Sequence, residues 1–332
     1  MSGVPSAAWV QGLPKAEVHV HLEGSLPPDL VTSAAAALGR ELPGRGFADL
    51  GGFLAYLDVS CAVITTGDQI ASAAYAVAAR AAAAGVRYVD LIWNPTHWPV
   101  WRDRLPAFVD ALDAGFRSAA DDGLPHVGLC VSLKRTQSAA EALELVERVT
   151  TLGHPRVVAL SIDGNEATTG RTGGRFAAAF ADARAAGLHC CAHAGESSGP
   201  EGVIDAIDQL GAERIDHGVR ALEDPALVGR LAALGIPLDV CPTSNVRLGV
   251  AASLPAHPIE ALRRKGVRVS VNTDDPVLFG STVDGEYRDC AAAFGWTPAD
   301  VGAIARTSIE SCFADAGLRQ DLLRDLDTYL AT

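Results

Sequence analysis

Basic residues are scarce in this sequence. Its 332 residues include 27 Lys and Arg against 40 Asp and Glu, which gives a formal net charge of −13. Proteins whose main partner is nucleic acid present a basic face to the phosphates. We therefore expect no nucleic-acid partner. The charge does not exclude a small nucleoside or base as ligand.

Long apolar runs and a cysteine framework are also missing. There is no stretch of about 18 or more uncharged apolar residues, so no membrane-spanning helix is predicted. Residues 1–15 lack the basic region followed by an apolar region that marks a signal peptide. The 7 cysteines are odd in number and contain no CxxC motif, which indicates reduced, buried thiols. From these absences we expect a cytoplasmic protein.

Short apolar segments alternate with segments of helical pattern along the chain. Eight predicted strands lie around residues 19–21 and at 86–93, 126–133, 157–163, 188–193, 214–219, 236–241 and 267–272. Predicted helices cover about 25–40, 53–65, 68–84, 106–122, 138–152, 174–186, 200–210, 224–234 and 258–265, and 42–52 is predicted as a loop. Eight such units in one chain predict an α/β fold of the (β/α)8 TIM-barrel type.

The predicted barrel forms a single domain over residues 1–332. Its tail, from about residue 283 to 332, has a helical pattern and is expected to pack outside the barrel or cap it. A doubly wound open sheet is the alternative architecture. Such a sheet normally carries a glycine-rich phosphate-binding turn after its first strand, and Glu23-Gly24-Ser25-Leu26 is not such a turn.

The first predicted strand contains His19-Val20-His21. Residues two apart in a strand share a face, so both imidazoles point the same way. Neutral imidazole is a common ligand for zinc and neighbouring metals. An isolated His-x-His motif also fits two surface histidines on an edge strand, so its meaning depends on the rest of the chain.

Polar residues recur at the ends of the later strands, where barrel enzymes carry their active sites. They are Asp163-Gly164-Asn165-Glu166, His193-Ala194-Gly195-Glu196, Asp216-His217 and Asn272-Thr273-Asp274-Asp275. Three histidines with one or two carboxylates suit a divalent metal, above all zinc. Of the adjacent Asp274 and Asp275, at most one is expected to face that metal.

Two further residues suit acid–base catalysis beside a metal. Glu196 follows His193 by three residues, which places a carboxyl near the metal without making it a ligand. A carboxyl in such a pocket can have a raised pKa and act as a general acid. His217 would act as a base or orient the attacking water.

The motifs HVHLEG, HAGE, DHGV, CPTSN and NTDDP occur in this order between about residues 15 and 276. Together they resemble the adenosine/adenine deaminase family of the amidohydrolase superfamily. This resemblance implies a zinc ion bound by His19, His21, His193 and Asp274. It also implies that Glu196 protonates purine N1, that His217 orients and deprotonates the attacking water, and that Asp275 hydrogen-bonds N7.

The reaction implied by this resemblance is a hydrolytic deamination in purine metabolism, of the EC 3.5.4 type. Water attacks C6 of a 6-aminopurine, N1 is protonated, and ammonia leaves. Two-metal members of the superfamily usually carry a bridging lysine after strand four, and residues 163–166 contain none. We therefore expect one Zn²⁺ per chain, with iron left open.

Three places depart from the usual adenosine deaminase pattern and resemble the adenine deaminase branch: Glu23, residues 163–166, and Asp216. Glu23 stands where an aspartate contacts the ribose 5′-hydroxyl. Gly164 lies in the stretch whose glycine backbone faces purine N3. The same changes suit enzymes for modified adenine nucleosides such as aminodeoxyfutalosine. The substituent on N9 therefore stays open.

Glu166 has two interpretations. Near N3 and N9 it would accept a hydrogen bond from the N9–H of a free base, which a nucleoside lacks. Otherwise it turns to solvent or pairs with Arg171 or Arg175. Further residues that could line the substituent pocket are Arg135, Trp93, Asn94, Trp98 and Trp101, but for the tryptophans packing of a long loop is the favoured interpretation.

Several other polar residues are expected to be structural. Cys241 is expected to be a buried packing residue, and Ser244 and Asn245 are expected to hold their loop by side-chain to backbone bonds. The remaining histidines are not expected to be metal ligands: His97, His126, His154, His189 and His257.

Two other functions fit the same residues. One is a metal-dependent hydrolase of another small cyclic substrate, such as a cyclic amide, lactone or phosphoester, because a fold does not determine a function. The other is a catalytically silent barrel that binds a nucleoside or a partner. Glu196 favours the deaminase, because lactone or phosphoester hydrolysis needs no ring protonation.

Overall fold

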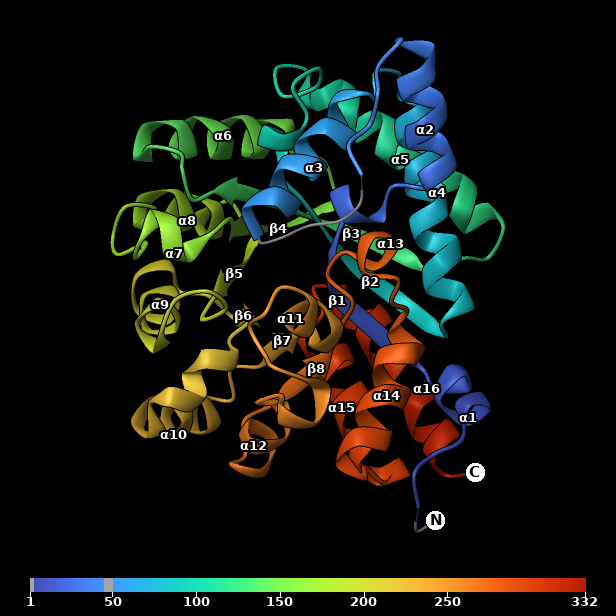
Figure 1. Cartoon of the computed structure of the whole chain (residues 1–332), viewed down its shortest axis with the longest axis vertical. Coiled ribbons are helices and arrows are strands. Elements are labelled where there is room, and N and C mark those ends of the chain that lie inside the picture. Colours follow the sequence, from blue (N-terminus) through green and yellow to red (C-terminus); the bar gives the residue numbers. More distant parts are fainter. Residues whose placement is uncertain (1–2, 45–49) are drawn as a thin grey trace.

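Eight parallel strands form a barrel in the computed structural model, which describes residues 3–44 and 50–332 (Figure 1). Each strand pairs with the next one in sequence. The strands are β1 (Lys15–His21), β2 (Val86–Trp93), β3 (His126–Lys134), β4 (Val157–Asp163), β5 (His189–Ala194), β6 (Arg214–His217), β7 (Leu238–Val240) and β8 (Val269–Val271). The predicted (β/α)8 barrel is confirmed.

The barrel closes where the chain after β8 meets β1. Val20 forms a parallel bridge with Asp274. The backbone N–H of His21 donates to the carbonyl of Asp274 at 2.8 Å, and the N–H of Asp274 donates to the carbonyl of His19 at 3.1 Å. This closure makes neighbours of polar residues that lie some 250 positions apart in sequence.

Helices surround the barrel and connect its strands (Figure 1). The longer α-helices are α2 (Pro28–Ala37), α3 (Leu50–Ala62), α4 (Gly67–Ala83), α5 (Leu105–Asp121), α6 (Ala139–Leu152), α8 (Ala177–Ala185), α10 (Pro225–Leu234), α14 (Val283–Phe294), α15 (Pro298–Ser311) and α16 (Ala316–Leu330). The shorter ones are α1 (Ala7–Gly12), α7 (Glu166–Thr169), α9 (Pro200–Asp205), α11 (Pro242–Arg247), α12 (Ile259–Arg264) and α13 (Pro276–Phe279). Single turns are η1 (Glu23–Ser25), η2 (Pro95–His97), η3 (Ala206–Leu210), η4 (Val219–Glu223) and η5 (Leu254–Ala256).

Local sequence determines where many of these helices begin and end. The side chain of Ser138 accepts a hydrogen bond from the N–H of Glu141, whose own carboxylate bonds back to the Ser138 N–H, so α6 begins with a capping box. The same helix ends at Gly153, whose φ of 56° is a left-handed cap that glycine adopts without a steric penalty. Such signals explain why the predicted order of elements agrees with the structure.

The C-terminal helices pack on the outside of the barrel, one of the two arrangements predicted for the helical tail. Helix α15 packs against β1 and β8, and α16 packs on α15. Ser308 of α15 accepts a hydrogen bond from the backbone N–H of Ala16 at 3.1 Å. In the part of the chain that the structure describes, no helix is long and apolar enough to cross a membrane.

Some predicted boundaries are wrong. Of the predicted loop 42–52, residues 45–49 lie outside the described residues, and residues 50–52 belong to α3. Helix α2 begins only at Pro28, after the single turn η1, and α8 begins at Ala177 rather than near 174. The unpredicted short helix α7 follows β4, and it is capped by the Asn165 side chain, which accepts from the N–H of Ala167. One turn is too short to show a helical period, so pattern alone could not find it.

Candidate active site

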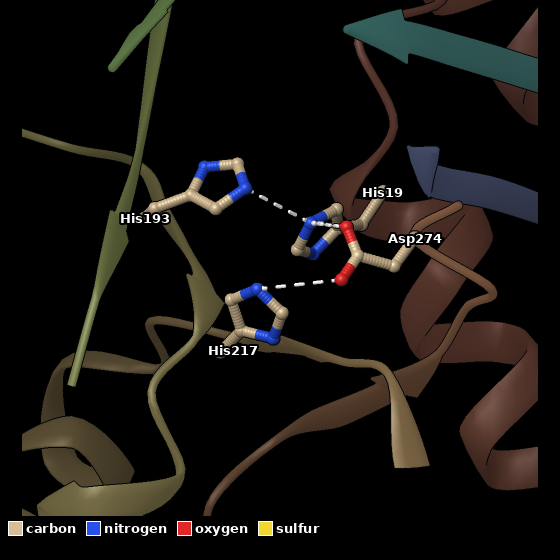
Figure 2. Close-up of side chains that lie close together, drawn as sticks. All are labelled: His19, His193, His217 and Asp274. Carbon is tan, nitrogen blue, oxygen red and sulfur yellow. Dashed lines mark hydrogen bonds and ion pairs between the residues drawn. The ribbon is translucent and has the colours of Figure 1, made fainter. Parts of the chain in front are cut away.

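The polar residues predicted at the strand ends converge at the carboxyl end of the barrel. His19 and His21 come from β1, His193 from β5, His217 from the end of β6, and Asp274 from the segment after β8. Figure 2 shows the rings of His193 and His217 facing His19 and Asp274. His19, His193, His217 and Asp274 are all buried.

Four of these side chains present their donor atoms to one point. The Nε2 atom of His193 lies 3.1 Å from Nε2 of His19 and 3.0 Å from Nε2 of His21. The Oδ1 atom of Asp274 lies 3.2 Å from each of the last two nitrogens. Two ligand atoms bound to the same zinc ion lie about 2.9–3.4 Å apart at four- or five-coordinate angles. These separations and this donor set therefore fit a zinc ion.

His217 lies beside these donors. A ring nitrogen of His217 is within 4.8 Å of donor atoms of His19, His193 and Asp274, so burial and proximity alone would admit it as a ligand. However, its Nε2 atom is 3.8 Å from the nearer oxygen of Asp274, whereas Nε2 of His21 is only 3.2 Å from that carboxylate. The shorter separations favour His21 as the fourth donor and leave His217 next to the metal position.

Neighbouring groups fix the orientation of the donors. The Nδ1 atom of His19 donates to the backbone carbonyl of Asp239 at 3.0 Å, and Nδ1 of His193 lies 3.2 Å from Oδ2 of Asp216. These contacts direct both Nε2 atoms toward the common point, as outer-shell partners do in metal sites. The hydroxyl of Ser244 donates to Oδ2 of Asp274 at 2.6 Å. Ser244 thus orients a candidate metal ligand. The sequence predicted only that Ser244 would hold its loop.

Backbone strain is concentrated at the same place. His217 and Asp274 have φ values of 66° and 65°, and no other described residue except glycine has a positive φ. Side chains other than glycine rarely adopt this conformation, which costs on the order of 1–3 kcal/mol per residue and recurs at functional sites. The surrounding structure holds both residues there, so their positions are imposed by the fold.

A chain of hydrogen bonds assigns the proton on His217. The backbone N–H of Ile259, which can only donate, lies 3.1 Å from Nδ1 of His257. Nε2 of His257 therefore carries the proton and donates to Oδ1 of Asn245 at 3.0 Å, and the Asn245 amide donates to Nδ1 of His217 at 3.2 Å. A neutral His217 then carries its proton on Nε2, the atom that faces the site. The loop motif containing Asn245 thus orients His217, a role that the sequence did not indicate.

Burial shifts the pKa values of Glu196 and His217 in opposite directions. It raises the pKa of Glu196 to about 8, and the negative charges of Asp274 and Glu166 add to this effect. Burial also lowers the pKa of His217 well below its usual range, and His19 lowers it further. The Glu196 Oε1 and His217 Nε2 atoms are 3.6 Å apart. Burial therefore favours the uncharged form of both groups, a protonated carboxyl and a neutral imidazole.

A pocket opens beside these groups. Its polar wall is formed by His21, Glu23, His97, Asp163, Gly164, His193, Glu196, His217, Asp274 and Asp275, and its apolar wall by Phe53, Leu54, Leu57 and Leu248. Three of the apolar residues come from α3. The sequence alone does not identify them as pocket residues, because an apolar helix face predicts core packing equally well. No lysine is found among the described residues that line this pocket.

Three residues predicted to contact substrate lie in the wall of this pocket: Glu23, Gly164 and Asp275. Oε1 of Glu23 accepts hydrogen bonds from the Asn94 N–H at 2.9 Å and the Trp98 indole at 2.7 Å. Within the described chain, Oε2 of Glu23 and Oδ1 of Asp275 are buried and have no hydrogen-bond partner. Hydrogen bonds within the described protein therefore account for only one of the two Glu23 oxygens.

The tryptophans and Asn94 lie behind the pocket wall. Trp93 stacks on Phe108, and Trp101 donates its indole N–H to the carbonyl of Ile64, so both are packing residues. Trp98 and the backbone of Asn94 hold Glu23. The Asn94 side chain donates to Oδ1 of Asp163 at 2.6 Å. Asn94 thus joins Glu23 to Asp163, the lining carboxylate that was not singled out as a substrate contact.

Glu166 occupies neither of its predicted positions. It does not line the pocket, and it does not turn to solvent or pair with Arg171 or Arg175. Its carboxylate accepts backbone N–H groups of residues 195–198 and lies near Arg135. Arg171 pairs instead with Asp205. The residue proposed to read purine N9 is therefore engaged inside the protein.

Comparison with known proteins gives the family. The family model described as adenosine deaminase matches residues 14–329. An adenine deaminase of Rhizobium leguminosarum bv. trifolii is 36% identical over 95% of this chain and 99% of its own length. The crystal structure of an adenine deaminase from Arthrobacter aurescens covers 96% of this chain and 100% of its own with a TM-score of 0.90 and 32% identity.

An amidohydrolase from Burkholderia ambifaria, solved with bound zinc, is also similar in structure. It covers 98% of this chain and 95% of its own at 28% identity, with a TM-score of 0.84. The family match extends over nearly the whole barrel, including the C-terminal helices. The chain therefore belongs to the adenosine deaminase family of hydrolytic deaminases.

Proposed function

We propose that this protein deaminates a 6-aminopurine by hydrolysis, with one zinc ion held by His19, His21, His193 and Asp274. The observation that carries the proposal is the convergence of three imidazole nitrogens and one carboxylate oxygen at 3.0–3.2 Å separations. Zinc bound there would lower the pKa of a water molecule to about 7 and act as a Lewis acid. The zinc-bound relative supports this choice of metal.

In this proposal Glu196 is the general acid. Its pKa of about 8 keeps the carboxyl protonated at neutral pH, and the pocket places it beside His217. Transfer of this proton to purine N1 makes C6 a better electrophile for water. A hydrolase acting on a lactone or phosphoester would have no use for an acid directed at a ring nitrogen, so Glu196 favours the deaminase.

His217 is proposed to orient the attacking water. Its hydrogen bond from Asn245 leaves the ring proton on Nε2, which faces the site. Its lowered pKa keeps the ring neutral. In this state Nε2 donates a hydrogen bond to the oxygen that attacks C6, so His217 does not accept the water proton. The water, whose pKa a zinc ion would lower to about 7, would lose that proton to solvent before the attack. This assignment narrows the two roles that the sequence left open for His217.

Asp275 is proposed to hold purine N7, which is a hydrogen-bond acceptor. Burial and the adjacent Asp274 raise the pKa of Asp275 well above its usual range. The carboxyl therefore keeps the proton that N7 requires, and Oδ1 of Asp275 has no other partner among the described residues. The backbone of Gly164 in the pocket wall is proposed to face N3.

We propose free adenine as the preferred substrate, with adenosine and modified nucleosides such as aminodeoxyfutalosine as alternatives. Glu23, held by Trp98 and Asn94, presents one buried oxygen without a partner among the described residues. A ring N–H at N9, which only the free base has, would satisfy that oxygen. Glu23 takes over the function that the sequence analysis assigned to Glu166. The apolar side chains from α3 cover the same pocket.

The cellular setting follows from the same proposal. All seven cysteines are buried and unpaired, which suits a reducing cytoplasm. The small pocket and the net charge of −13 suit a small-molecule substrate rather than nucleic acid. We propose that residues 1–332 act as one catalytic domain.

The test is a deamination assay of the zinc-loaded protein. Adenine, adenosine, 5′-modified adenosines and aminodeoxyfutalosine are compared by the change in ultraviolet absorbance, with metal content measured in parallel. We expect turnover of adenine above the others, its loss on chelation, and its return with Zn²⁺. Preference for a nucleoside would contradict the proposal that Glu23 accepts the N9–H of free adenine. Failure of all 6-aminopurines at one zinc per chain would favour another cyclic substrate.

A further inference from the structure

We infer that the buried ion pair of Arg135 and Glu166 positions the loop that carries Glu196. Both would then be positioning residues for the deamination proposed above, on which this inference rests. Neither residue lines the pocket, so they act through the loop and not by touching the substrate.

Glu166 holds three backbone groups of that loop. Its Oε1 atom accepts from the N–H of Gly195 at 3.2 Å. Its Oε2 atom accepts from the N–H groups of Glu196 at 3.0 Å and Ser198 at 3.4 Å. The side chain is only 3% exposed. One carboxylate therefore satisfies the backbone on both sides of the proposed general acid, and such charge-assisted bonds are about twice as strong as neutral ones.

Arg135 connects this carboxylate to the metal-binding strand. Its Nη2 atom is 3.6 Å from Oε1 of Glu166 and also donates to the backbone carbonyl of His193. The backbone N–H of Arg135 donates to the carbonyl of Asp163 at 2.9 Å. The pair thus connects the ends of β3, β4 and β5 at the point where the chain turns from His193 to Glu196.

The loop conformation depends on this support. Gly195 has a φ of 64°, and the strand direction is lost there, so the N–H groups that follow cannot join a ladder. Without an acceptor, the buried N–H groups of Gly195 and Glu196 would lose their hydrogen bonds at a cost in free energy. A conformation that points them at one carboxylate also fixes where the Glu196 side chain leaves the backbone.

Space for the carboxylate is provided by a glycine. A Cβ atom added at Gly202 of α9 would lie 2.6 Å from Oε1 of Glu166 and 2.9 Å from Oγ of Ser198. Alanine is normally a better helix former than glycine. Glycine at this position therefore matches the close approach of Glu166, and Gly202→Ala is a second, steric way to displace the carboxylate.

The experiment compares Glu166→Gln with Asp205→Asn. Asp205 is a matched control because it is also a buried carboxylate that accepts a backbone N–H, that of Gly173 at 3.0 Å, and pairs with an arginine, Arg171. Its hydrogen bonds and ion pair within the described chain go to Arg171 and Gly173, not to residues 195–198. The readouts are kcat and KM for the 6-aminopurine that the wild type uses, bound zinc per chain, and amide hydrogen exchange of residues 195–198.

For Glu166→Gln we expect kcat to fall by about 10²-fold, because displacement of a reacting group by about 1 Å has an effect of this size. KM and zinc content should stay within about threefold of the wild type, since no ligand or lining residue changes. Amide exchange of 195–198 should be faster. Gly202→Ala should act in the same direction, and Asp205→Asn should leave kcat and this exchange unchanged.

Two results would overturn the inference. One is a Glu166→Gln variant whose kcat and loop exchange match those of Asp205→Asn. The other is a parallel loss of zinc and activity, which would mean that the pair supports His193 and not Glu196. Hydrogen exchange is measured without substrate, so the inference can be tested even if no 6-aminopurine is turned over. A protected loop in the wild type with no deamination would reject only the proposed function.

Discussion

The two ends of the barrel interior both bury charge, but they neutralise it differently. Near the amino end, the Arg214 guanidinium lies 2.6 Å from Asp90 and 2.8 Å from Asp239, and it donates to the carbonyl of Val18. The ring of Phe313 covers it at 3.9 Å. Here the chain supplies both signs of charge, and the contacts are complementary.

At the carboxyl end, like atoms face one another. The Nε2 atoms of His19 and His21 each approach Nε2 of His193 within 3.0–3.1 Å, and one carboxylate lies beside them. Lone pairs at this distance repel unless a proton or a cation lies between them. One end of the interior thus balances its charges within the chain, whereas the other leaves like atoms facing one another, an arrangement that a bound cation would stabilise. Asp239 belongs to both, since its carbonyl accepts from His19.

The largest effect is expected from Glu196→Gln at the carboxyl end. The amide keeps the shape of the carboxyl but cannot protonate N1, so kcat should fall by about 10²–10⁴-fold. Zinc content and substrate binding should persist, because Glu196 is not one of the proposed ligands. Steady-state kinetics and equilibrium binding measure the two separately. Unchanged turnover in this variant would remove Glu196 from the mechanism.

The substitution Arg214→Met removes the buried cation at the amino end of the barrel interior. Removing one partner of a buried pair leaves uncompensated charge on Asp90 and Asp239, and we expect the free energy of unfolding to fall by about 3–5 kcal/mol. Urea denaturation measures this. The control is Asp208→Asn, which removes an exposed pair with Arg230 and should change stability by about 1 kcal/mol at most. Equal effects of the two substitutions would contradict the distinction between buried and exposed pairs.

The substitution Asn245→Asp should move the ring proton of His217 from Nε2 to Nδ1, with little change in the shape of the side chain at position 245. Aspartate can only accept, so it would draw the ring proton of His217 to Nδ1 and leave Nε2 bare toward the site. We expect kcat to fall by about 10²-fold, the lower part of the range for acid–base groups. Nitrogen NMR of labelled histidine reports the tautomer directly. A wild-type His217 with its proton on Nδ1 would contradict the hydrogen-bond chain from Ile259.

The smallest effect is expected in the pH dependence of kcat/KM. Glu196 must be protonated to act, and burial with nearby Asp274 and Glu166 raises its pKa to about 8. Therefore kcat/KM should be level below about pH 8 and should fall about tenfold per pH unit above it. In Glu166→Gln the loss of a neighbouring negative charge should move this alkaline limb to lower pH. A profile that stays level above pH 8, or a limb that does not move in Glu166→Gln, would count against the acid role.

Local sequence patterns were sufficient to predict the barrel and the candidate metal donors. Each βα unit has its own apolar period and its own caps, so local patterns predicted the strands in the correct order. His19 and His21 share a face because of the strand period alone, and the motifs around His193 and Asp274 follow strand ends, whose location in a barrel is fixed. These inferences needed no knowledge of which residues meet across the fold.

The roles of the residues around the candidate donors became apparent only from the three-dimensional structure. The sequence left Glu166 two positions, near the substrate or turned to solvent and nearby arginines. Its partners instead come from the loop after the next strand, about 30 positions away, and from Arg135. His257 looked like a loop residue until its place behind Asn245 and His217 was visible. A carboxylate or an imidazole has the same sequence signature whether it meets water, substrate or backbone. Its partner is set by long-range packing, and that partner determines its charge, its proton and its role.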